Sequence, residues 1–309
     1  MLALTSPKKS TVVRKLQPPN LVRAAFAMGS WIAPRATIAR ATDVFCTPSA
    51  DARRKAAVAD DGGAASSTLQ AGPYALQVYR WGDPASQPSV LIAHGWSDFA
   101  LRFLPLVDAL RAAGHAVVTF DQPGHGRSSG DTATLREFAR CIRLVGEHFG
   151  RAAAVIGHSM GGAAAAIALH EGLAADRAVL IAPPADLAAA ADRFADAVGL
   201  AGHLRPRLHR ALEARASVRM EELQAHRNVR EIDRPALIIH DLLDREVPWE
   251  EGERYARYWP SARMLSTVGL GHNRILGDTA VIGAVLDFLR GHTVGERIVS
   301  TPDLPFGFA

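Results

Sequence analysis

Residues 153–162, Ala-Ala-Val-Ile-Gly-His-Ser-Met-Gly-Gly, decide how the rest of the sequence is read. The apolar run 153–156 predicts a short buried strand, and the Ala-rich run 162–169 predicts a helix. Ser159 lies between them, with Gly157 and Gly161 two positions to either side. A serine on so sharp a turn has strained dihedrals, and side chains at the two glycine positions would collide across the bend. The stretch therefore predicts a serine hydroxyl presented at the end of a sheet, beside the free N–H groups of a helix.

The bulk composition describes a soluble globular protein. The chain has 309 residues, of which 48% are hydrophobic, enough for one large domain and some extra segments. The net charge is +4, but charges of both signs alternate through most of the chain, without a basic stripe that contains aromatic residues, so we expect no nucleic-acid partner. Cys46 and Cys141 lie far apart; free buried thiols are favoured over a disulfide, and no metal-ligand spacing is present.

The N-terminal segment is basic. Residues 1–42 contain seven Lys or Arg and no Asp or Glu, and residues 21–45 predict one or two short amphipathic helices, broken by Gly29 and Pro34. We favour an arm packed on the domain; the alternatives are contact with an anionic membrane surface or a transit segment. Lys and Arg interrupt every candidate signal peptide and no apolar run is long enough to span a membrane, so a cytoplasmic location is expected, with peripheral membrane association as the alternative. Residues 51–67 are small and polar, which indicates a linker or mobile loop.

Apolar strands alternate with helices from about residue 69. The expected strands are 74–81, 90–93, 116–120, 153–156, 178–182, 236–239 and 263–267. The helices between them carry start and stop signals, such as a Thr134-x-x-Glu137 capping box, a Pro105 in a first turn and a Gly114 after a helix end. The last helix is expected over 278–290. This alternation predicts a mostly parallel sheet with helices on both faces.

The segment 183–233 interrupts the alternation with helical stretches at 185–198, 205–217 and 220–228. We interpret it as a small helical cap over the site, with a longer crossover of ordinary surface helices as the alternative. The resulting organisation is an arm and linker over 1–68, a core formed by 69–183 and 234–291, a cap over 184–233, and a tail over 292–309.

A serine nucleophile needs a base and an acid that orients the base. The candidate base is His272, in a Gly-rich loop directly after the last strand. The candidate acid is Asp244, about four residues past the strand 236–239, and Asp241 is its rival. We prefer Asp244 because Val247 and the proline after it close a loop of the type that turns an acid toward a histidine; a turn-capping aspartate is the structural alternative. The order Ser, Asp, His agrees with this choice.

An oxyanion site needs backbone N–H groups beside the serine. We expect them from Met160, which follows the serine, and from Trp96, with Gly95 allowing the backbone to approach. His94 is expected to brace this loop by a hydrogen bond. His158 is expected to point away from the site on the turn and to be structural. The glycines of 121–128 fit neither phosphate-loop spacing, so we interpret that segment as a structured turn beside the site.

Five segments together resemble the α/β-hydrolase superfamily, in its serine esterase and lipase-like branch. They are Ile92-Ala-His-Gly-Trp96, Asp121-Gln-Pro-Gly-His-Gly-Arg-Ser128, Gly157-His-Ser-Met-Gly-Gly162, Asp244-x-x-Val-Pro248 and Gly271-His272. The resemblance covers about residues 70–291 and implies an eight-stranded sheet with only the second strand antiparallel, a variable cap after the sixth strand, and no cofactor. Serine at position 159 argues against haloalkane dehalogenases and epoxide hydrolases, which use aspartate there. Asp241 departs from the pattern, since many relatives have glycine at that position.

These observations predict a serine hydrolase, with a nucleophile elbow at Ser159, that cleaves small-molecule carboxylic esters of short to medium acyl chain length through an acyl-enzyme. An acyltransferase, a C–C hydrolase or an aminopeptidase-like enzyme would use the same three residues, and the fold does not separate them. The alternative of another class is a ligand-binding protein that keeps the fold without turnover.

Overall fold

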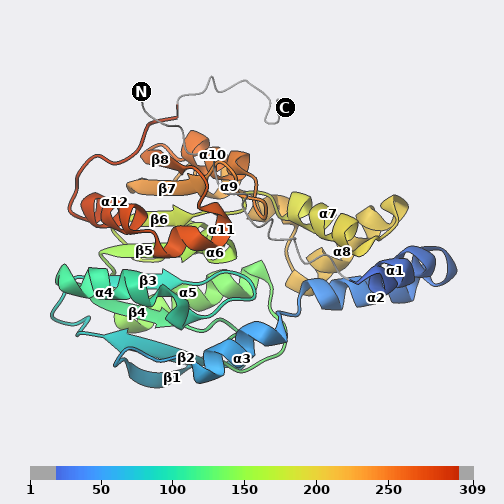
Figure 1. Cartoon of the computed structure of the whole chain (residues 1–309), viewed down its shortest axis with the longest axis horizontal. Helices are drawn as coiled ribbons and strands as arrows, with labels where there is room; N and C mark the ends of the chain where they lie inside the picture. The colour runs from blue at the N-terminus through green and yellow to red at the C-terminus, as the bar shows by residue number, and fades with distance from the viewer. Residues whose placement is uncertain (1–18, 299–309) are drawn as a thin grey trace, which may run out of the picture.

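The structure, a computed structural model, describes residues 19–298; the expectations for residues 1–18 of the basic arm and 299–309 of the tail lie outside them. One eight-stranded sheet runs through the molecule in the order β1-β2-β4-β3-β5-β6-β7-β8 (Figure 1). The strands have these bounds: β1 Ala65–Ala71, β2 Tyr74–Trp81, β3 Ser89–Ala93, β4 Ala116–Phe120, β5 Ala154–His158, β6 Ala178–Ile181, β7 Ala236–Asp241 and β8 Ala262–Thr267.

Only β2 runs against the other strands. It pairs antiparallel with β1 on one side and with β4 on the other, whereas every remaining neighbouring pair is parallel. The α/β-hydrolase fold, with a mostly parallel sheet in which the second strand alone is antiparallel, is therefore confirmed. The six parallel strands β3 to β8 end at the same edge of the sheet. The residues that follow these strands therefore gather at that edge.

Helices cover both faces of the sheet. Alternate side chains of each strand point to opposite faces and so contribute to both cores. In β3, Leu91 and Ala93 face one core while Val90 and Ile92 face the other, and all four are buried. The helices of the first layer are α5 Leu135–Phe149, α6 Met160–His170 and α10 Trp249–Tyr258; those of the second are α4 Leu104–Ala112 and α12 Thr279–Leu289.

The helix signals of the sequence match these bounds. Thr134 and Glu137 form the expected capping box at the start of α5: the Thr134 hydroxyl accepts from the Glu137 N–H, and the Glu137 carboxylate accepts from the Thr134 N–H. Pro105 lies in the first turn of α4, and Gly114 follows the helix with φ 90°. Asp278 caps α12 by accepting from two backbone N–H groups of its first turn.

Two helical segments distant in sequence lie together beyond the carboxyl ends of the strands (Figure 1). The cap segment, 184–233, contains α7 Leu187–Val198, η2 Gly202–Leu204, α8 Arg205–Ala216, η3 Met220–Leu223 and α9 Ala225–Asn228. The N-terminal segment contains α1 Asn20–Ile32 and α2 Pro34–Phe45. Phe26 and Ile38 of the N-terminal helices share a small core with Ala191, Leu208 and other residues of α7 and α8. In the described residues, the arm is thus packed on the cap segment.

The expectation of a linker over 51–67 is wrong. A helix, α3 Ala50–Val58, and the first strand, β1, occupy most of that range, so the sheet begins before residue 69. Ser49 caps α3, and Arg127 donates to carbonyl oxygens at its end, including those of Ala56 and Ala59. The sequence misled because β1 is an edge strand with its side chains largely exposed on both faces, which leaves no apolar alternation to detect.

Both cysteines are free and buried, as expected. Burial raises the pKa of Cys46 to about 11 and that of Cys141 to about 12, so both are neutral thiols at pH 7. Among residues 19–298, no helix has the length and apolar character to cross a membrane.

We predict that two helical glycines respond oppositely to alanine. A Cβ at Gly161 would lie 2.4 Å from the backbone oxygen of His94, whereas a Cβ at Gly283 of α12 would meet no atom within 4 Å. Gly161→Ala should lower the free energy of unfolding by about 3 kcal/mol or more, because backbone must move. Gly283→Ala should raise it by up to about 1 kcal/mol through helix propensity. Urea denaturation measures both, and equal effects of the two changes would contradict this account.

Candidate active site

Ser159 sits on a strained turn between β5 and α6. Its backbone has φ 51° and ψ −127°, a region that residues with a side chain rarely adopt. The turn is fixed by its neighbours: the Ser159 N–H donates to the carbonyl of Ile181 in β6, at 2.8 Å. A Cβ at Gly157 would lie 2.4 Å from the backbone oxygen of Gly161, and a Cβ at Gly161 would lie 2.4 Å from that of His94, so both positions need glycine. The turn therefore has the geometry that the sequence predicted for a nucleophile elbow.

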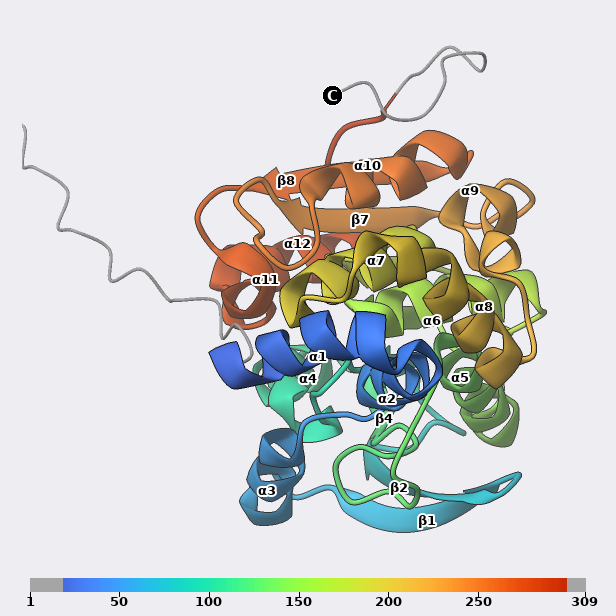
Figure 2. The ribbon, with the colours of Figure 1, turned by 90° about the vertical axis from the view of Figure 1, so that its right-hand side faces the viewer.

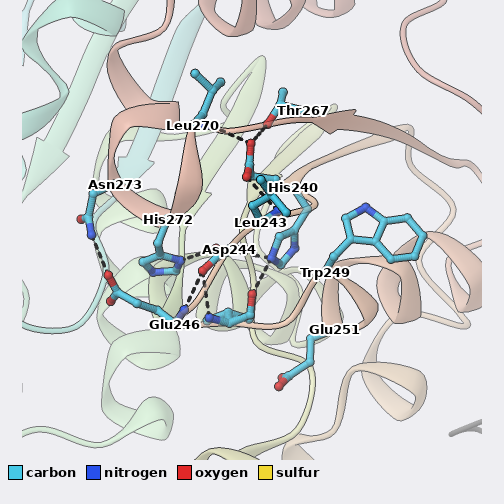
Figure 3. A network of polar contacts seen from close by, with 12 residues as sticks. His240, Leu243, Asp244, Glu246, Trp249, Glu251, Thr267, Leu270, His272 and Asn273 are labelled. Atoms are coloured by element: carbon cyan, nitrogen blue, oxygen red, sulfur yellow. Dashed lines mark hydrogen bonds and ion pairs between the residues drawn. The ribbon is translucent and has the colours of Figure 1, made fainter. Parts of the chain in front are cut away.

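His272 lies in the short helix α11 Gly271–Arg274, in the loop after β8. Its Nδ1 is 2.7 Å from Oδ2 of Asp244, in the loop after β7 (Figure 3). A carboxylate oxygen only accepts, so this contact places a proton on Nδ1 and leaves Nε2 as the acceptor of the neutral ring. The imidazole is thus held in the tautomer that a general base requires.

The carboxylate of Asp244 is fully buried and surrounded by donors. Its Oδ1 accepts from the backbone N–H groups of Glu246 and Val247, at 2.8 and 3.1 Å. Figure 3 shows Asp244 between two imidazoles, those of His272 and His240. Burial alone raises the pKa of Asp244, but hydrogen bonds from the two histidines and the backbone outweigh it and hold the pKa far below its usual value. Asp244 is therefore ionised at neutral pH.

Sequence reasoning missed His240. Its Nε2 lies 3.0 Å from the carbonyl oxygen of Val247 and 3.5 Å from Oδ2 of Asp244. Both neighbours are acceptors, so Nε2 carries the proton. Gly252 makes room for the ring, since a Cβ there would lie 2.2 Å from Nδ1 of His240. The available signal was the position of His240 near the carboxyl end of a strand, directly before the two candidate aspartates.

Asp241, the rival acid, has other partners. Its carboxylate accepts from the Thr267 hydroxyl at 2.8 Å and from the N–H groups of Leu270 and Gly269, at 2.9 and 3.3 Å. These three residues lead from β8 into the loop that carries His272. The structure thus brings Asp244, and not Asp241, to the imidazole, while Asp241 braces the loop that positions it.

Ser159 and His272 line one cavity, but within residues 19–298 no hydrogen bond joins their side chains. Catalytic hydrogen bonds are often long in the absence of substrate. His158 links the two residues instead: its Nε2 donates to the carbonyl oxygen of His272 at 2.9 Å, and the two rings lie 4.8 Å apart. The expectation that His158 points away from the site is therefore wrong, because it faces the loop of the candidate base.

The two expected oxyanion donors also line this cavity. Within the described part of the chain, the backbone N–H groups of Trp96 and Met160 donate to no other residue. Gly95 permits the approach of the loop that carries Trp96, since a Cβ there would lie 2.9 Å from Cβ of Ser159. The His94 ring shapes the loop: Nδ1 donates to the oxygen of Gly95 at 2.7 Å, and Nε2 accepts from the Gln122 N–H at 2.9 Å.

The segment 121–128 forms a buried turn against the same loop. Nε2 of His125 accepts from the Ser97 N–H at 3.1 Å, and its ring lies edge-on to Trp96. Asp121 accepts from the N–H groups of Ala100 and Arg127, at 2.8 Å each. The segment is thus a structured turn that holds the loop after β3.

The cavity has a volume of about 650 Å³ and extends from Ser159 to the helices above it. Its apolar wall comes from α2, α7 and α8 and includes Val44, Phe45, Leu187, Phe194 and Leu212. Of its acidic side chains, Asp98 forms an ion pair with Arg102 at 3.5 Å, and Glu246 accepts a hydrogen bond from the neutral amide of Asn273 at 2.8 Å. The described residues contain no group of three His, Cys, Asp or Glu side chains that could hold a metal ion. A nucleophile, a base and unused N–H donors at an apolar cavity can perform acyl transfer.

Comparison with known families places this arrangement in context. The sequence profile of the family described as serine aminopeptidase, S33, matches residues 84–263, more than half of the chain. Among curated protein sequences, none matches.

Many solved structures share the fold. Est1E from Butyrivibrio proteoclasticus, solved with bound ferulic acid, has a TM-score of 0.56 at 18% identity, covering 73% of this chain and 98% of its own. The esterase Pf2001 from Pyrococcus furiosus has a TM-score of 0.56 at 21% identity, with 74% and 92% coverage. Proline iminopeptidase from Mycobacterium smegmatis has a TM-score of 0.56 at 18% identity, with 74% and 98% coverage.

We predict that the two aspartates differ in their effect on Ser159. Asp244→Asn should slow the reaction of Ser159 with a fluorophosphonate by about 10⁴-fold, because the amide favours the wrong imidazole tautomer. Asp241→Asn should slow it far less, because its carboxylate touches the loop and not the ring of His272. The rate of covalent labelling measures both variants, and an equal loss would remove the distinction.

We predict that acid destabilises the fold through buried histidines. Burial lowers the pKa of His94 to about 4 and that of His125 to about 3. Below about pH 6.5 the unfolded chain binds protons that these folded residues do not, so the free energy of unfolding falls as the pH falls, by about 1.4 kcal/mol per pH unit for each histidine. His125→Gln should make the dependence of the free energy of unfolding on pH shallower by about 1.4 kcal/mol per pH unit between about pH 6 and pH 4. Denaturation curves at several pH values test this, and an unchanged slope would contradict it.

Proposed function

Because the chain belongs to the α/β-hydrolase superfamily, in the family described as serine aminopeptidase, S33, we propose that this serine hydrolase cleaves carboxylic esters of short to medium acyl chain length through an acyl-enzyme. The observation that carries the proposal is the 2.7 Å contact between Asp244 and His272, at the cavity that Ser159 also lines. Pf2001, which is described as an esterase, and Est1E, which was solved with ferulic acid, share the fold.

In the proposed mechanism, His272 is the base, Ser159 the nucleophile and Asp244 the acid that orients the base. Nε2 of His272 takes the proton of the Ser159 hydroxyl as its oxygen attacks the ester carbonyl. The oxyanion accepts from the N–H groups of Trp96 and Met160, each such donor being worth about 10²–10³ in rate. His272 then protonates the leaving alkoxide, and an alcohol departs from the acyl-enzyme. Water, deprotonated by His272, attacks the acyl carbonyl and releases the acid, while Ser159 regains its proton.

The cavity favours a neutral ester over a peptide amine. Recognition of a free amino terminus needs an anionic group that is available to it. The charge of Asp98 is paired with Arg102, and Glu246, whose charge Asn273 does not neutralise, is exposed to solvent, where its attraction for an amine is weak. The rest of the lining is mainly apolar. This argues for an ester substrate against the aminopeptidase-like alternative. Acyl transfer and C–C hydrolysis would use the same residues, and the products of the reaction separate them.

The strained turn at Ser159 argues against the ligand-binding alternative. This backbone conformation costs stability, and a protein that only bound a ligand would not need it. Its position at the same cavity as the Asp244–His272 contact supports turnover.

We predict that Ser159→Ala abolishes both covalent labelling by a fluorophosphonate and hydrolysis of p-nitrophenyl esters, with a loss of at least about 10⁴-fold, because the acyl-enzyme cannot form. Ser86→Ala, at an exposed turn far from the cavity, is the matched control and should behave as the unchanged protein. A series from acetate to octanoate measures acyl preference, and release of the free acid identifies hydrolysis. Full labelling of the Ser159 variant would refute the assignment.

A further inference from the structure

The outer face of α1 is apolar and exposed. After Asn20, every exposed residue of this helix is apolar, and none carries a charge. Leu21 is 82% exposed, Met28 61%, Trp31 75% and Ile32 76%. Together with Val22, these are five of the nine large apolar side chains exposed within residues 19–298. A soluble protein rarely exposes so concentrated an apolar surface unless that surface binds a partner or a membrane.

Contacts with the cap segment fix this orientation. Phe26 and Ser30 are buried on the inner side of α1, where the Ser30 hydroxyl accepts from the Ala201 N–H at 3.2 Å. Arg23, the one charged residue of the helix, donates to the carbonyl oxygen of Ala197 in α7 at 2.8 Å. The charge is thus held at the inner side of the helix, and the apolar stripe is left to the outside. Figure 2 shows α1 at the front of the molecule, over α2 and beside α7.

The charge of the sequence segment that contains α1 points to its partner. The first 42 residues contain seven Lys or Arg and no Asp or Glu. Arg35 and Arg40 are exposed on α2, which follows directly. An anionic lipid surface attracts such a segment and accepts an apolar helix face among its headgroups. A second copy of this chain would bring the same cations together, which opposes self-association.

We propose that α1 is a docking helix that lies in the plane of an anionic membrane surface, with Leu21, Met28, Trp31 and Ile32 buried in it. Resting on the proposed ester hydrolysis, the inference deepens it by naming the substrate class: esters that partition into that surface. Val44 and Phe45 of α2 and Phe194 of α7 line the cavity and also pack against the small core that α1 and α2 share with α7 and α8. Docking of α1 therefore brings the apolar wall of the cavity to the membrane.

The test is co-sedimentation of the full chain with vesicles. The chain should pellet with vesicles of phosphatidylcholine and phosphatidylglycerol and not with phosphatidylcholine alone. Met28→Gln with Ile32→Gln, two exposed positions changed to a good helix former, should weaken binding at least tenfold. Val58→Gln, an equally exposed apolar residue at the end of α3, is the matched control and should bind as the unchanged protein. Equal binding of the double variant, or no binding of the unchanged chain, overturns the proposal.

Two further measurements separate the outcomes. Fluorophosphonate labelling of Ser159 in solution should be unchanged by Met28→Gln with Ile32→Gln, whereas hydrolysis of an ester embedded in the anionic vesicles should fall with binding. Labelling without vesicle binding would overturn the docking alone, and vesicle binding without labelling would overturn the ester hydrolysis alone. If the double variant instead converts a dimer to a monomer in sedimentation, the apolar face belongs to a second copy and the membrane proposal fails.

Discussion

The site depends on a backbone contact that no side chain allows. β5 and α6 meet so closely at Ser159 that a Cβ at Gly157 would lie 2.4 Å from the backbone oxygen of Gly161. The loop after β3 approaches from the other side: a Cβ at Gly161 would lie 2.4 Å from the backbone oxygen of His94, and a Cβ at Gly95 would lie 2.9 Å from Cβ of Ser159. The strain of a serine at φ 51°, about 1–3 kcal/mol, persists because the buried strands on both sides leave the turn no other course. The hydroxyl and the neighbouring N–H groups are therefore placed by the sheet itself.

A second constraint is electrostatic. A buried carboxylate is stable only when donors replace the water that it loses. Asp244 has two backbone N–H groups and two imidazoles around it, and this requirement shapes the loop as far as Val247. The carboxylate of Asp241, three positions earlier, instead accepts hydrogen bonds from the end of β8 and the loop after it. The two aspartates thus have different roles: Asp244 contacts the ring of His272, and Asp241 holds the loop that carries His272.

The parts of the fold that follow local rules could be predicted from the sequence. The turn at Ser159 and the capping box of α5 carry signals within a few residues, and the strand-end rule placed Asp244 and His272 at one edge. β1 and α3 escaped because their residues are polar or small and mostly exposed. His240 and the inward turn of His158 escaped for another reason: both depend on contacts between loops far apart in sequence, which no local pattern encodes.

The substrate end of the cavity rests on the same kind of long-range contact. The cap segment alone does not form its wall, because α2 packs against α7 and α8 and contributes Val44 and Phe45. The sequence profile that identifies the family begins at residue 84, so it does not extend to these two residues. Membership in the family therefore accounts for the fold around Ser159, while the shape of this cavity wall depends on the packing of α1 and α2 on the cap segment. A change that loosens this small shared core would alter the shape of the cavity without touching Ser159, Asp244 or His272.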